Sequence, residues 1–448
     1  MELSNDIKAL FFLGIGGIGM SALARYFKRQ GYTVTGYDRT PSALTKELEE
    51  EGILVGYQDS LAWLNSLGLR SESTLVVRTP AVPEDSIIYT YLREQGFTIR
   101  KRAEVLGMVT SQKKALCVAG THGKTTTSTM IAHIMAKGVN AFLGGISLNY
   151  NTNVLIDPQS EYVVVEADEY DRSFLHLHPY ITVVTAVDAD HLDIYGTEEA
   201  YREAFADYTS LVEKAVVMKQ GIALQPRLKP GCQLHTYGPE NATNIRVSEG
   251  EITFDYTSPL ATIKDIRLGV PVWVNIENAV AAITVALLVG IDAEQIKKQL
   301  ASFKGVWRRF NIHVSTPKVA YVDDYAHHPQ EIATAIDSIR KLYPTRKLIG
   351  VFQPHLYTRT RDFADGFRKV LGTLDECILL PIYPAREEPI PGVTSEILGG
   401  QVVEKADLIA ELQKRVAESK EPVVVLTVGA GDIDRLVDGI AAALRLEV

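Results

Sequence analysis

Residues 115–127 are ALCVAGTHGKTTT, an apolar run that passes through two glycines into a lysine and three threonines. The pattern predicts a strand over Ala115–Ala119, a tight turn, and a helix that continues to Ala136. A turn between a strand and a helix can wrap phosphates with its backbone N–H groups, while a lysine reaches the β- and γ-phosphates and a hydroxyl reaches Mg²⁺. Lys124 and Thr125 stand where that mechanism needs them.

The turn is a short variant of the phosphate-binding loop, because Val118 occupies the place of the first glycine in the longer pattern. The alternative is a plain glycine turn with a surface lysine. The strand before the turn and the helix after it favour phosphate binding, so we predict that Lys124 and Thr125 belong to a nucleotide site.

Two further predicted strands end in residues that can hold a metal. Tyr162–Glu166 delivers Glu166 to a strand's carboxyl end, where ligands bind in open α/β sheets and a carboxylate can hold Mg²⁺ against phosphates. The carboxylates that follow it are interpreted as a solvated acidic loop: Asp168, Glu169 and Asp171. Ile181–Val187 is followed by His191, which taken alone is an ordinary strand-end histidine. Two acidic strand ends after a phosphate loop favour His191 as a second metal ligand.

A second glycine turn lies near the N-terminus, after a predicted strand over Ala9–Leu13. The stretch GIGGIG, with Asp38 beyond it, formally meets the dinucleotide-binding fingerprint. A nicotinamide-dependent oxidoreductase is therefore a rival class, although the motif itself indicates only a pyrophosphate at a helix N-terminus. The predicted contacts are Gly14, Gly16, Gly17, Gly19 and Asp38.

The C-terminal third carries the stretch DDYAHHP after a predicted strand over Val319–Val322. Pro329 opens the next helix at its first turn, which leaves Asp324 and His327 on a loop at a strand end. Such loops favour binding work, and capping of the helix is the alternative.

Two arginines are candidates for anion binding. Arg359 lies at a predicted strand–helix junction and Arg308 near the second domain boundary; a guanidinium in either place suits a carboxylate or a phosphate. A solvated arginine is the default interpretation of each.

Composition narrows the function class. A chain of 448 residues with a net charge of −9 and no basic block argues against nucleic acid as a partner. Its three cysteines have neither disulfide nor metal-ligand spacing, which suits a reducing compartment. No apolar stretch is long enough to span a bilayer, and the N-terminal apolar run leads into a glycine turn and has no basic leader. We expect a cytoplasmic protein without a membrane partner.

The order of elements predicts an α/β fold with parallel sheets. Short apolar runs, glycine turns and amphipathic helices alternate in three blocks, with boundaries near residues 105 and 312. Residues 216–257 contain β-rich runs that suggest an additional antiparallel patch.

Taken together, these motifs resemble those of the Mur ligases of peptidoglycan synthesis. The chain carries in the family's order the segments GIGGIGMSALA, GTHGKTTT, EADE, DADHLD, NIENAVAA, GVWRRF, DDYAHHP, FQPHLYTRTRD and TVGAGD. Each is weak alone, whereas nine in order are very specific. The resemblance implies three domains: a Rossmann-like UDP-binding domain over 1–105, an ATPase-type domain over 106–312, and a Rossmann-like, amino-acid-binding domain over 313–448.

The resemblance also implies an activity. The motifs are most similar to those of the members that join L-alanine to UDP-N-acetylmuramate, with ATP and Mg²⁺ as cofactors. A recycling member, which attaches a tripeptide to the same sugar nucleotide, is the alternative. The chain departs from many relatives at Leu356, where they have an arginine. A monomer or a weak homodimer is expected.

Site roles follow position by position from the resemblance. Thr125, Glu166 and His191 would hold metal, and His327 and Arg359 would lie near the incoming alanine. Lys124, His191, His327 and Arg359 are the expected catalytic residues. The expected ATP contacts are Gly120, Thr121, His122, Gly123, Lys124, Thr125, Thr126, Asn278, Arg308 and Asp324.

Overall fold

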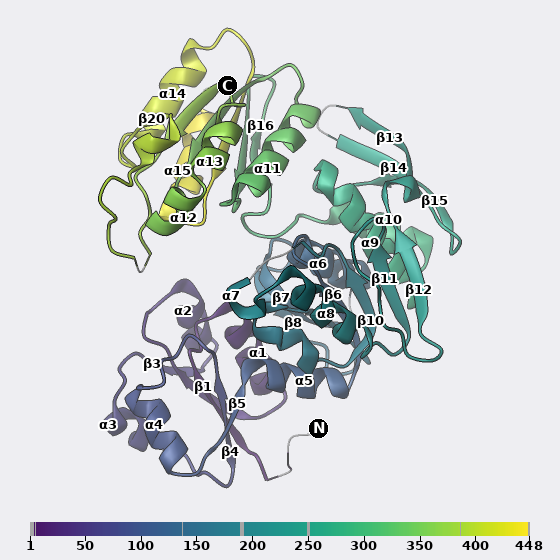
Figure 1. The fold of residues 1–448 in the computed structure, drawn as a ribbon, viewed down its shortest axis with the longest axis vertical. Coiled ribbons are helices and arrows are strands. Elements are labelled where there is room, and N and C mark those ends of the chain that lie inside the picture. The colour runs from purple at the N-terminus through teal and green to yellow at the C-terminus, as the bar shows by residue number, and fades with distance from the viewer. Residues whose placement is uncertain are drawn as a thin grey trace. The chain divides into compact units, whose positions relative to one another are not determined.

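The computed structural model describes residues 4, 6–136, 138–188, 192–248, 251–385 and 387–446. The chain forms two compact units (Figure 1). One comprises residues 1–243, 255–266 and 278–303, and the other comprises residues 244–254, 267–277 and 304–448. Each is described by itself.

The first unit begins with a five-stranded parallel sheet in the order β3-β2-β1-β4-β5. Its strands are β1 (Ala9–Leu13), β2 (Thr33–Tyr37), β3 (Leu54–Gly56), β4 (Thr74–Arg78) and β5 (Thr98–Lys101). The helices that connect and follow them are α1 (Ile18–Arg29), α2 (Ala43–Glu50), α3 (Leu61–Ser66), α4 (Ile87–Glu94) and α5 (Arg102–Ser111). Apolar residues on both faces of β1 are buried, which explains its continuous hydrophobic run.

The same unit contains a seven-stranded sheet in the order β12-β11-β10-β6-β9-β7-β8. Its strands are β6 (Lys114–Ala119), β7 (Asn140–Ser147), β8 (Thr152–Leu155), β9 (Tyr162–Glu166), β10 (Pro179–Val184), β11 (Ala215–Lys219) and β12 (Gln233–Tyr237). All neighbours pair in parallel except β7 and β8. The accompanying helices are α6 (Lys124–Met135), η1 (Tyr170–His176), α7 (Leu192–Tyr195) and α8 (Glu198–Thr209).

Buried polar groups join these two sheets within the first unit. Arg25 of α1, which is 7% exposed, donates from Nη1 to Oδ1 of Asn153 in β8 over 2.7 Å. The amide of Asn153 donates in turn to the carbonyl of Ile18 (2.5 Å) and to Oγ of Ser21 (3.0 Å). Asn153 is fully buried, and its side-chain amide is a hydrogen-bond partner both for the Arg25 guanidinium and for the first turn of α1.

Three strands and two helices lie between the central and C-terminal sheets in sequence. The strands form a sheet in the order β13-β14-β15, and the segments are η2 (Pro239–Asn241), β13 (Ala242–Ser248), β14 (Glu251–Thr257), β15 (Thr262–Arg267), α9 (Trp273–Leu288) and α10 (Ala293–Ser302).

The second unit is built on a six-stranded sheet in the order β16-β17-β21-β18-β19-β20. Its strands are β16 (Asn311–Ser315), β17 (Val319–Asp324), β18 (Lys347–Phe352), β19 (Glu376–Leu379), β20 (Gln401–Val402) and β21 (Val423–Val428). Only β16 pairs in the antiparallel sense among these strands.

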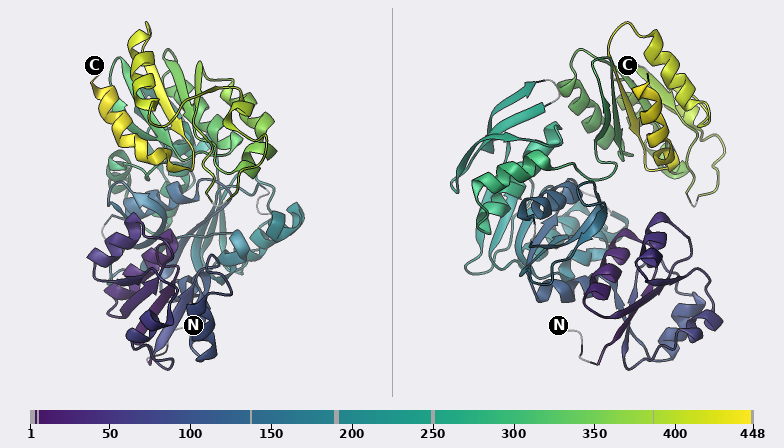
Figure 2. Two further views of the ribbon diagram at one scale, coloured as in Figure 1. Left: turned by 90° about the vertical axis from the view of Figure 1, so that its left-hand side faces the viewer. Right: turned by 180° about the vertical axis from the view of Figure 1, so that it is seen from behind.

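Helices cover both faces of this sheet; the yellow and the green ones lie on opposite sides of it in the left view of Figure 2. The helical segments are α11 (Pro329–Leu342), α12 (Tyr357–Asp362), α13 (Ala364–Leu371), η3 (Ser395–Leu398), α14 (Leu408–Glu418), η4 (Asp432–Leu436) and α15 (Val437–Arg445).

The predicted α/β fold with three parallel blocks is confirmed, and three details were wrong. The strand expected over Ile181–Val187 ends at Val184, and the helix expected from Asn278 begins at Trp273. Part of the stretch 216–257 was misread as antiparallel, since β11 and β12 pair in parallel and extend the central sheet. Among the described residues, no helix has the length and apolar character needed to cross a membrane.

Replacing Asn153 by alanine should destabilise the first unit. The substitution leaves the Arg25 guanidinium without its buried acceptor, a loss of about 1–3 kcal/mol in the free energy of unfolding. Urea denaturation followed by circular dichroism measures it. As a matched control, Asn65→Ala on the exposed face of α3 should change the same quantity by less than about 0.5 kcal/mol. Equal effects of the two substitutions would contradict the role given to Asn153.

Candidate active site

The glycine turn after β6 has the backbone of a phosphate-binding loop. Gly120 and Gly123 have φ angles of +129° and +80°, a region that L residues with side chains rarely adopt. Gly123 is the N-cap of α6, and Lys124 is that helix's first residue. The free N–H groups of the first helical turn therefore lie beside the lysine, which suits an anion.

A threonine after β10 holds this loop in place. The hydroxyl of Thr185 donates to the carbonyl of His122 over 2.5 Å. A Cβ on Gly120 would lie 2.2 Å from Oγ1 of Thr185, so only a glycine fits there. On the other side, the Thr121 hydroxyl donates to the carbonyl of Asp188 over 2.9 Å. No sequence pattern predicts the role of Thr185, because its contact with the loop depends on the pairing of β6 with β10.

Lys124 is paired with a buried carboxylate. Its Nζ donates to the carbonyl of Gly120 (2.6 Å) and to both carboxylate oxygens of Glu169 (2.8 Å each). Glu169 is 2% exposed, so its interpretation as part of a solvated acidic loop was wrong. Its neighbours Asp168 and Asp171 are partly exposed and pair with Arg102 and Lys101.

Glu166 lies at the same edge of the sheet as the loop. In the parallel pairing of β6 with β9, Glu166 is opposite Val118, two residues before Gly120. Gly144 of β7 makes room for it, since a Cβ at that position would lie 2.0 Å from Oε2 of Glu166. A glycine inside a strand often marks such a close approach, so Gly144 is a signal in the sequence from which this contact could have been predicted.

A hydroxyl and a carboxylate are suitable ligands for Mg²⁺. The predicted pair is Thr125, the second residue of α6, and Glu166. Mg²⁺ prefers oxygen ligands and commonly takes one or two from the protein and the rest from water and substrate phosphates, so this donor set fits. The predicted ligand His191 lies outside the described residues, among which no group of three or more His, Cys, Asp or Glu side chains could hold a metal.

Asn278, one of the residues predicted to contact ATP, lies against the loop. It is 8% exposed, and its Oδ1 accepts from the hydroxyl of Thr127 over 3.2 Å. A Cβ on Gly123 would come within 2.9 Å of the same oxygen. Residues 120–127 and Asn278 are thus brought together across about 150 residues of sequence.

The N-terminal glycine turn is held by its own acid. The N–H of Gly16 donates to Oδ2 of Asp38 over 2.8 Å. A residue that the sequence did not reveal, Arg102, packs against the same turn, because a Cβ on Gly19 would lie 2.6 Å from its Nη1. The other end nitrogen of this guanidinium pairs with Asp168 at 3.1 Å, so one arginine connects the glycine turn with the acidic loop after β9.

In the second unit Arg308 is buried and already engaged. It is 5% exposed, donates from Nε to Asp323 over 3.1 Å, and donates from Nη2 to the carbonyl of Gly429 over 2.7 Å. The default of a solvated arginine was therefore wrong for this residue. The other expected ATP contact in this unit, Asp324, accepts N–H groups from Phe310 and Ala326, and burial raises the pKa of its carboxyl to about 6.

His327 and Arg359 converge on a third residue, His355. The rings of His327 and His355 are 6.4 Å apart, and Nη1 of Arg359 lies 3.5 Å from Nδ1 of His355. Burial lowers the pKa of His327. The Glu331 carboxylate and the carbonyl of Tyr325 oppose this shift, whereas Arg359 and Arg309 reinforce it. His327 is therefore neutral at pH 7 and can accept a proton.

The departure at Leu356 coincides with an unusual backbone. Leu356 has a φ of +70°, which side-chain-bearing residues rarely adopt, and its N–H donates to the carbonyl of Tyr383 over 3.0 Å. This turn presents Arg359 in the following helix α12.

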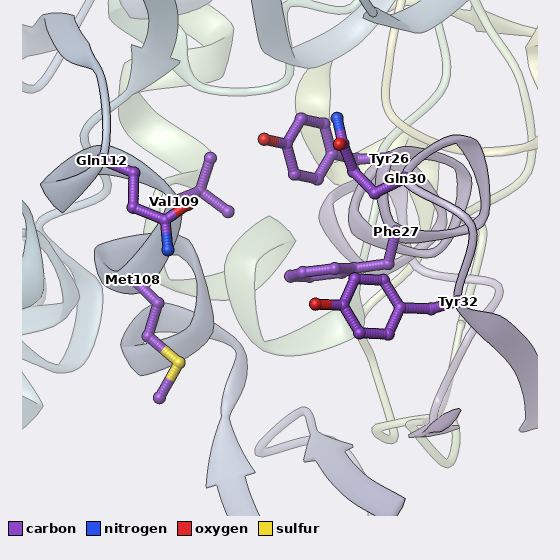
Figure 3. Close-up of a pocket in the computed structure, with 7 residues that line it drawn as sticks. All are labelled: Tyr26, Phe27, Gln30, Tyr32, Met108, Val109 and Gln112. Carbon is purple, nitrogen blue, oxygen red and sulfur yellow. The ribbon is translucent and has the colours of Figure 1, made fainter. Parts of the chain in front are cut away.

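A separate cleft of about 300 Å³ lies between the C-terminal parts of α1 and α5 (Figure 3). None of the predicted site residues lines it, and the glycine turn is at the other end of α1. Its lining residues are Tyr26, Phe27, Gln30, Tyr32, Met108, Val109 and Gln112. The cleft is therefore distinct from both phosphate-type turns.

The parallel sheets, the loop headed by Lys124 and the carboxylate beside it define a class of α/β proteins that bind nucleotide phosphates. Three family models match the chain: "Mur ligase family, catalytic domain" at residues 10–114, "Mur ligase middle domain" at 118–286 and "Mur ligase, glutamate ligase domain" at 308–431. The chain belongs to the Mur ligase family.

Individual relatives match over nearly their whole length. The chain is 54% identical to a UDP-N-acetylmuramate–L-alanine ligase of Phocaeicola vulgatus, covering 98% of this chain and 99% of the relative. It is 51% identical to the protein of the same name from Parabacteroides distasonis, covering 99% of each. The crystal structure of a UDP-N-acetylmuramate-alanine ligase from Thermotoga maritima matches with a TM-score of 0.78 at 27% identity, over 98% of this chain and all of that one.

Replacing Gly144 by alanine should weaken binding of a divalent cation. The new Cβ would collide with the Glu166 carboxylate and displace it, and disturbing the groups that orient a ligand costs about 10–100-fold in metal affinity. The measurement is the Mg²⁺ dependence of thermal stabilisation by ATP. In the Glu166→Ala background, Gly144→Ala should have no further effect; full additivity of the two changes would show that the glycine does not act through this carboxylate.

Proposed function

We propose that this protein is an ATP-dependent ligase that joins L-alanine to the carboxylate of UDP-N-acetylmuramate in peptidoglycan precursor synthesis, and thereby serves cell-wall biogenesis, cell shape and cell division. The single observation that carries the proposal is the glycine turn after β6, in which Lys124 begins a buried helix at the sheet edge where β9 ends in Glu166. Relatives named UDP-N-acetylmuramate–L-alanine ligase match nearly the whole chain, and they support the choice of substrates. The protein acts in the cytoplasm as a monomer or a weak homodimer.

In the first step, a substrate carboxylate attacks the γ-phosphorus of ATP. The bond from the carboxylate oxygen to phosphorus forms, the bond to the β,γ-bridging oxygen breaks, and the products are an acyl phosphate and ADP. Two anions must approach, and Lys124 at the helix N-terminus offsets their repulsion. Mg²⁺ bound by Thr125 and Glu166 would screen the same phosphates. His191 is proposed as a ligand of a second metal ion.

In the second step, the amine of alanine attacks the acyl carbon. A tetrahedral intermediate forms, phosphate leaves, and the amine loses a proton. We assign that proton to neutral His327, and the carboxylate of alanine to Arg359, which has the fork of donors that a carboxylate needs. With no arginine at position 356, Arg359 does more of this work.

The remaining assignments concern the two nucleotides. Residues 120–126 and Asn278 bind ATP. Arg308 and Asp324 also contact it; the guanidinium has five N–H donors and two bonds to Asp323 and Gly429 leave capacity for a phosphate. The glycine turn and Asp38 bind the UDP part of the other substrate, with pyrophosphate at Gly14, Gly16, Gly17 and Gly19.

One assay tests the proposal and its alternatives. Phosphate release should require ATP, UDP-N-acetylmuramate and L-alanine together. The recycling alternative would show release with a peptidoglycan tripeptide in place of alanine. The rival oxidoreductase would bind NAD(H), detectable by nicotinamide fluorescence, and would ignore ATP. A protein that only binds nucleotide would release no phosphate with any combination.

Replacing Lys124 by alanine should abolish this release while the protein stays folded. The loss of one cation at the phosphates raises the barrier by about 2–4 kcal/mol, roughly 30- to 1,000-fold in rate. Lys114→Ala is the matched control, because Lys114 lies at the other end of β6 and pairs with Glu161 at the surface. Near-normal turnover of the Lys124 variant would disprove the loop assignment.

The role of His327 predicts a pH dependence. Because burial lowers its pKa, the side chain stays neutral down to pH values below about 6.5 and loses its function as a base only as the pH falls through that lowered value. The ratio of kcat/KM for alanine in the wild type to that in His327→Gln should be about 100 at neutral pH, and it should fall towards one only as the pH drops through the lowered pKa of His327. Comparing this ratio cancels the titration of the substrate amine.

The adjacent histidine provides the control for this profile. His328 is the N-cap of α11, so His328→Gln should keep the acidic limb of the wild-type profile. A wild-type to His327→Gln ratio close to one at pH 8, where His327 is neutral, would rule out His327 as the base.

A further inference from the structure

The pair formed by Lys124 and Glu169 has a geometry that the proposed reaction does not use. Both carboxylate oxygens of Glu169 lie 2.8 Å from Nζ of Lys124, and the carbonyl oxygen of Gly120 lies 2.6 Å from the same nitrogen. An ammonium group has three N–H donors. Gly120 and Glu169 can therefore occupy all three donors of the lysine that is expected to bind the β- and γ-phosphates.

The backbone of Glu169 is held in place by two hydrogen bonds. The hydroxyl of Tyr195, which is 5% exposed, donates to the backbone carbonyl of Glu169 over 2.5 Å, and the N–H of Arg172 donates to the same carbonyl over 3.0 Å. The Arg172 guanidinium stacks over the Tyr195 ring at 5.0 Å. Asp171 and Arg172 have φ angles of +50° and +55°, so the chain turns sharply two residues after Glu169.

We propose that Glu169 competes with the phosphates of ATP for Lys124. The inference rests on the proposed function, in that it takes residues 120–126 as the ATP phosphate site. Glu169 is a positioning residue: its carboxylate satisfies a mostly buried lysine in the empty loop and must give up at least one of its bonds when a phosphate enters. A phosphate oxygen and a carboxylate at one ammonium repel each other in a site from which water is largely excluded.

This competition has a consequence that a purely structural pair would not have. Removing the negative charge of Glu169 should strengthen the binding of ligands with β- and γ-phosphates. It should not change the binding of adenosine, which has no phosphate to offer to Lys124. It should also lower the thermal stability of the empty protein, because the lysine loses its buried partner.

The test is the affinity of Glu169→Gln for ATP, measured by isothermal titration calorimetry with EDTA present, so that no metal ion contributes. We expect binding at least about fivefold tighter than in the wild type, and unchanged affinity for adenosine. Glu161→Gln is the matched control: it makes the same chemical change in a surface pair with Lys114, at the opposite ends of β6 and β9, and should leave ATP affinity unchanged.

Several outcomes would overturn the inference. They are weaker or unchanged ATP binding by Glu169→Gln, a change in thermal stability alone, and an equal gain in Glu161→Gln. If Glu169→Gln does not fold, Glu169→Asp replaces it, since the shorter side chain draws the charge away from Nζ. Tighter ATP binding by that variant supports the competition, and weaker or equal binding contradicts it.

The same titrations separate this inference from the proposed function. If Lys124→Ala binds ATP as well as the wild type does, the loop is not the phosphate site and the proposed function itself fails. If Lys124→Ala loses affinity while Glu169→Gln keeps the wild-type value, only the competition is disproved.

Discussion

The parallel pairing of β6 with β9 on one side and β10 on the other is the constraint on which the site depends. Parallel strands end at the same edge of a sheet, so the residues that follow them meet there whatever their distance in sequence. The registers Val118–Glu166 and Ala119–Val184 place the glycine turn, the acid and the threonine that holds the turn side by side. A slip of one residue would turn Glu166 to the opposite face of the sheet.

An acidic protein that binds anions must keep its cations in defined positions. The chain carries a net charge of −9, and three of the basic side chains at its candidate sites form ion pairs. Each is held by an acid: Lys124 by Glu169, Arg102 by Asp168, and Arg308 by Asp323. Burying a cation without a partner is costly, so the acids keep these groups folded into place. For Lys124, the proposed binding of phosphates is an exchange of partners, whereas Arg308 can keep its bonds to Asp323 and Gly429 and still has N–H donors to spare.

Close packing of backbone against functional side chains is the second theme. Gly144 leaves the space that the Glu166 carboxylate fills, and Gly19 leaves the space for the Arg102 guanidinium. In both places the atom nearest to an added methyl group belongs to the charged end of the neighbouring side chain. Catalytic groups need positions accurate to a fraction of an ångström, and a missing Cβ is one way for a protein to provide that accuracy.

The local sequence determined the elements and the chemical character of the loops. Strand–glycine–helix patterns predicted β6, the phosphate-type turn and α6, because the conformational demands of such a turn are met only by particular residues at particular spacings. The local sequence did not predict that Glu169 is buried or that Arg102 connects the glycine turn with Asp168. It also did not predict that Thr185 contacts the loop or that Arg308 pairs with Asp323. Each of these depends on which strands pair and in which register, and pairing is a property of the folded chain. The sequence specified which groups could bind phosphate, whereas the tertiary structure decided which acid each cation meets.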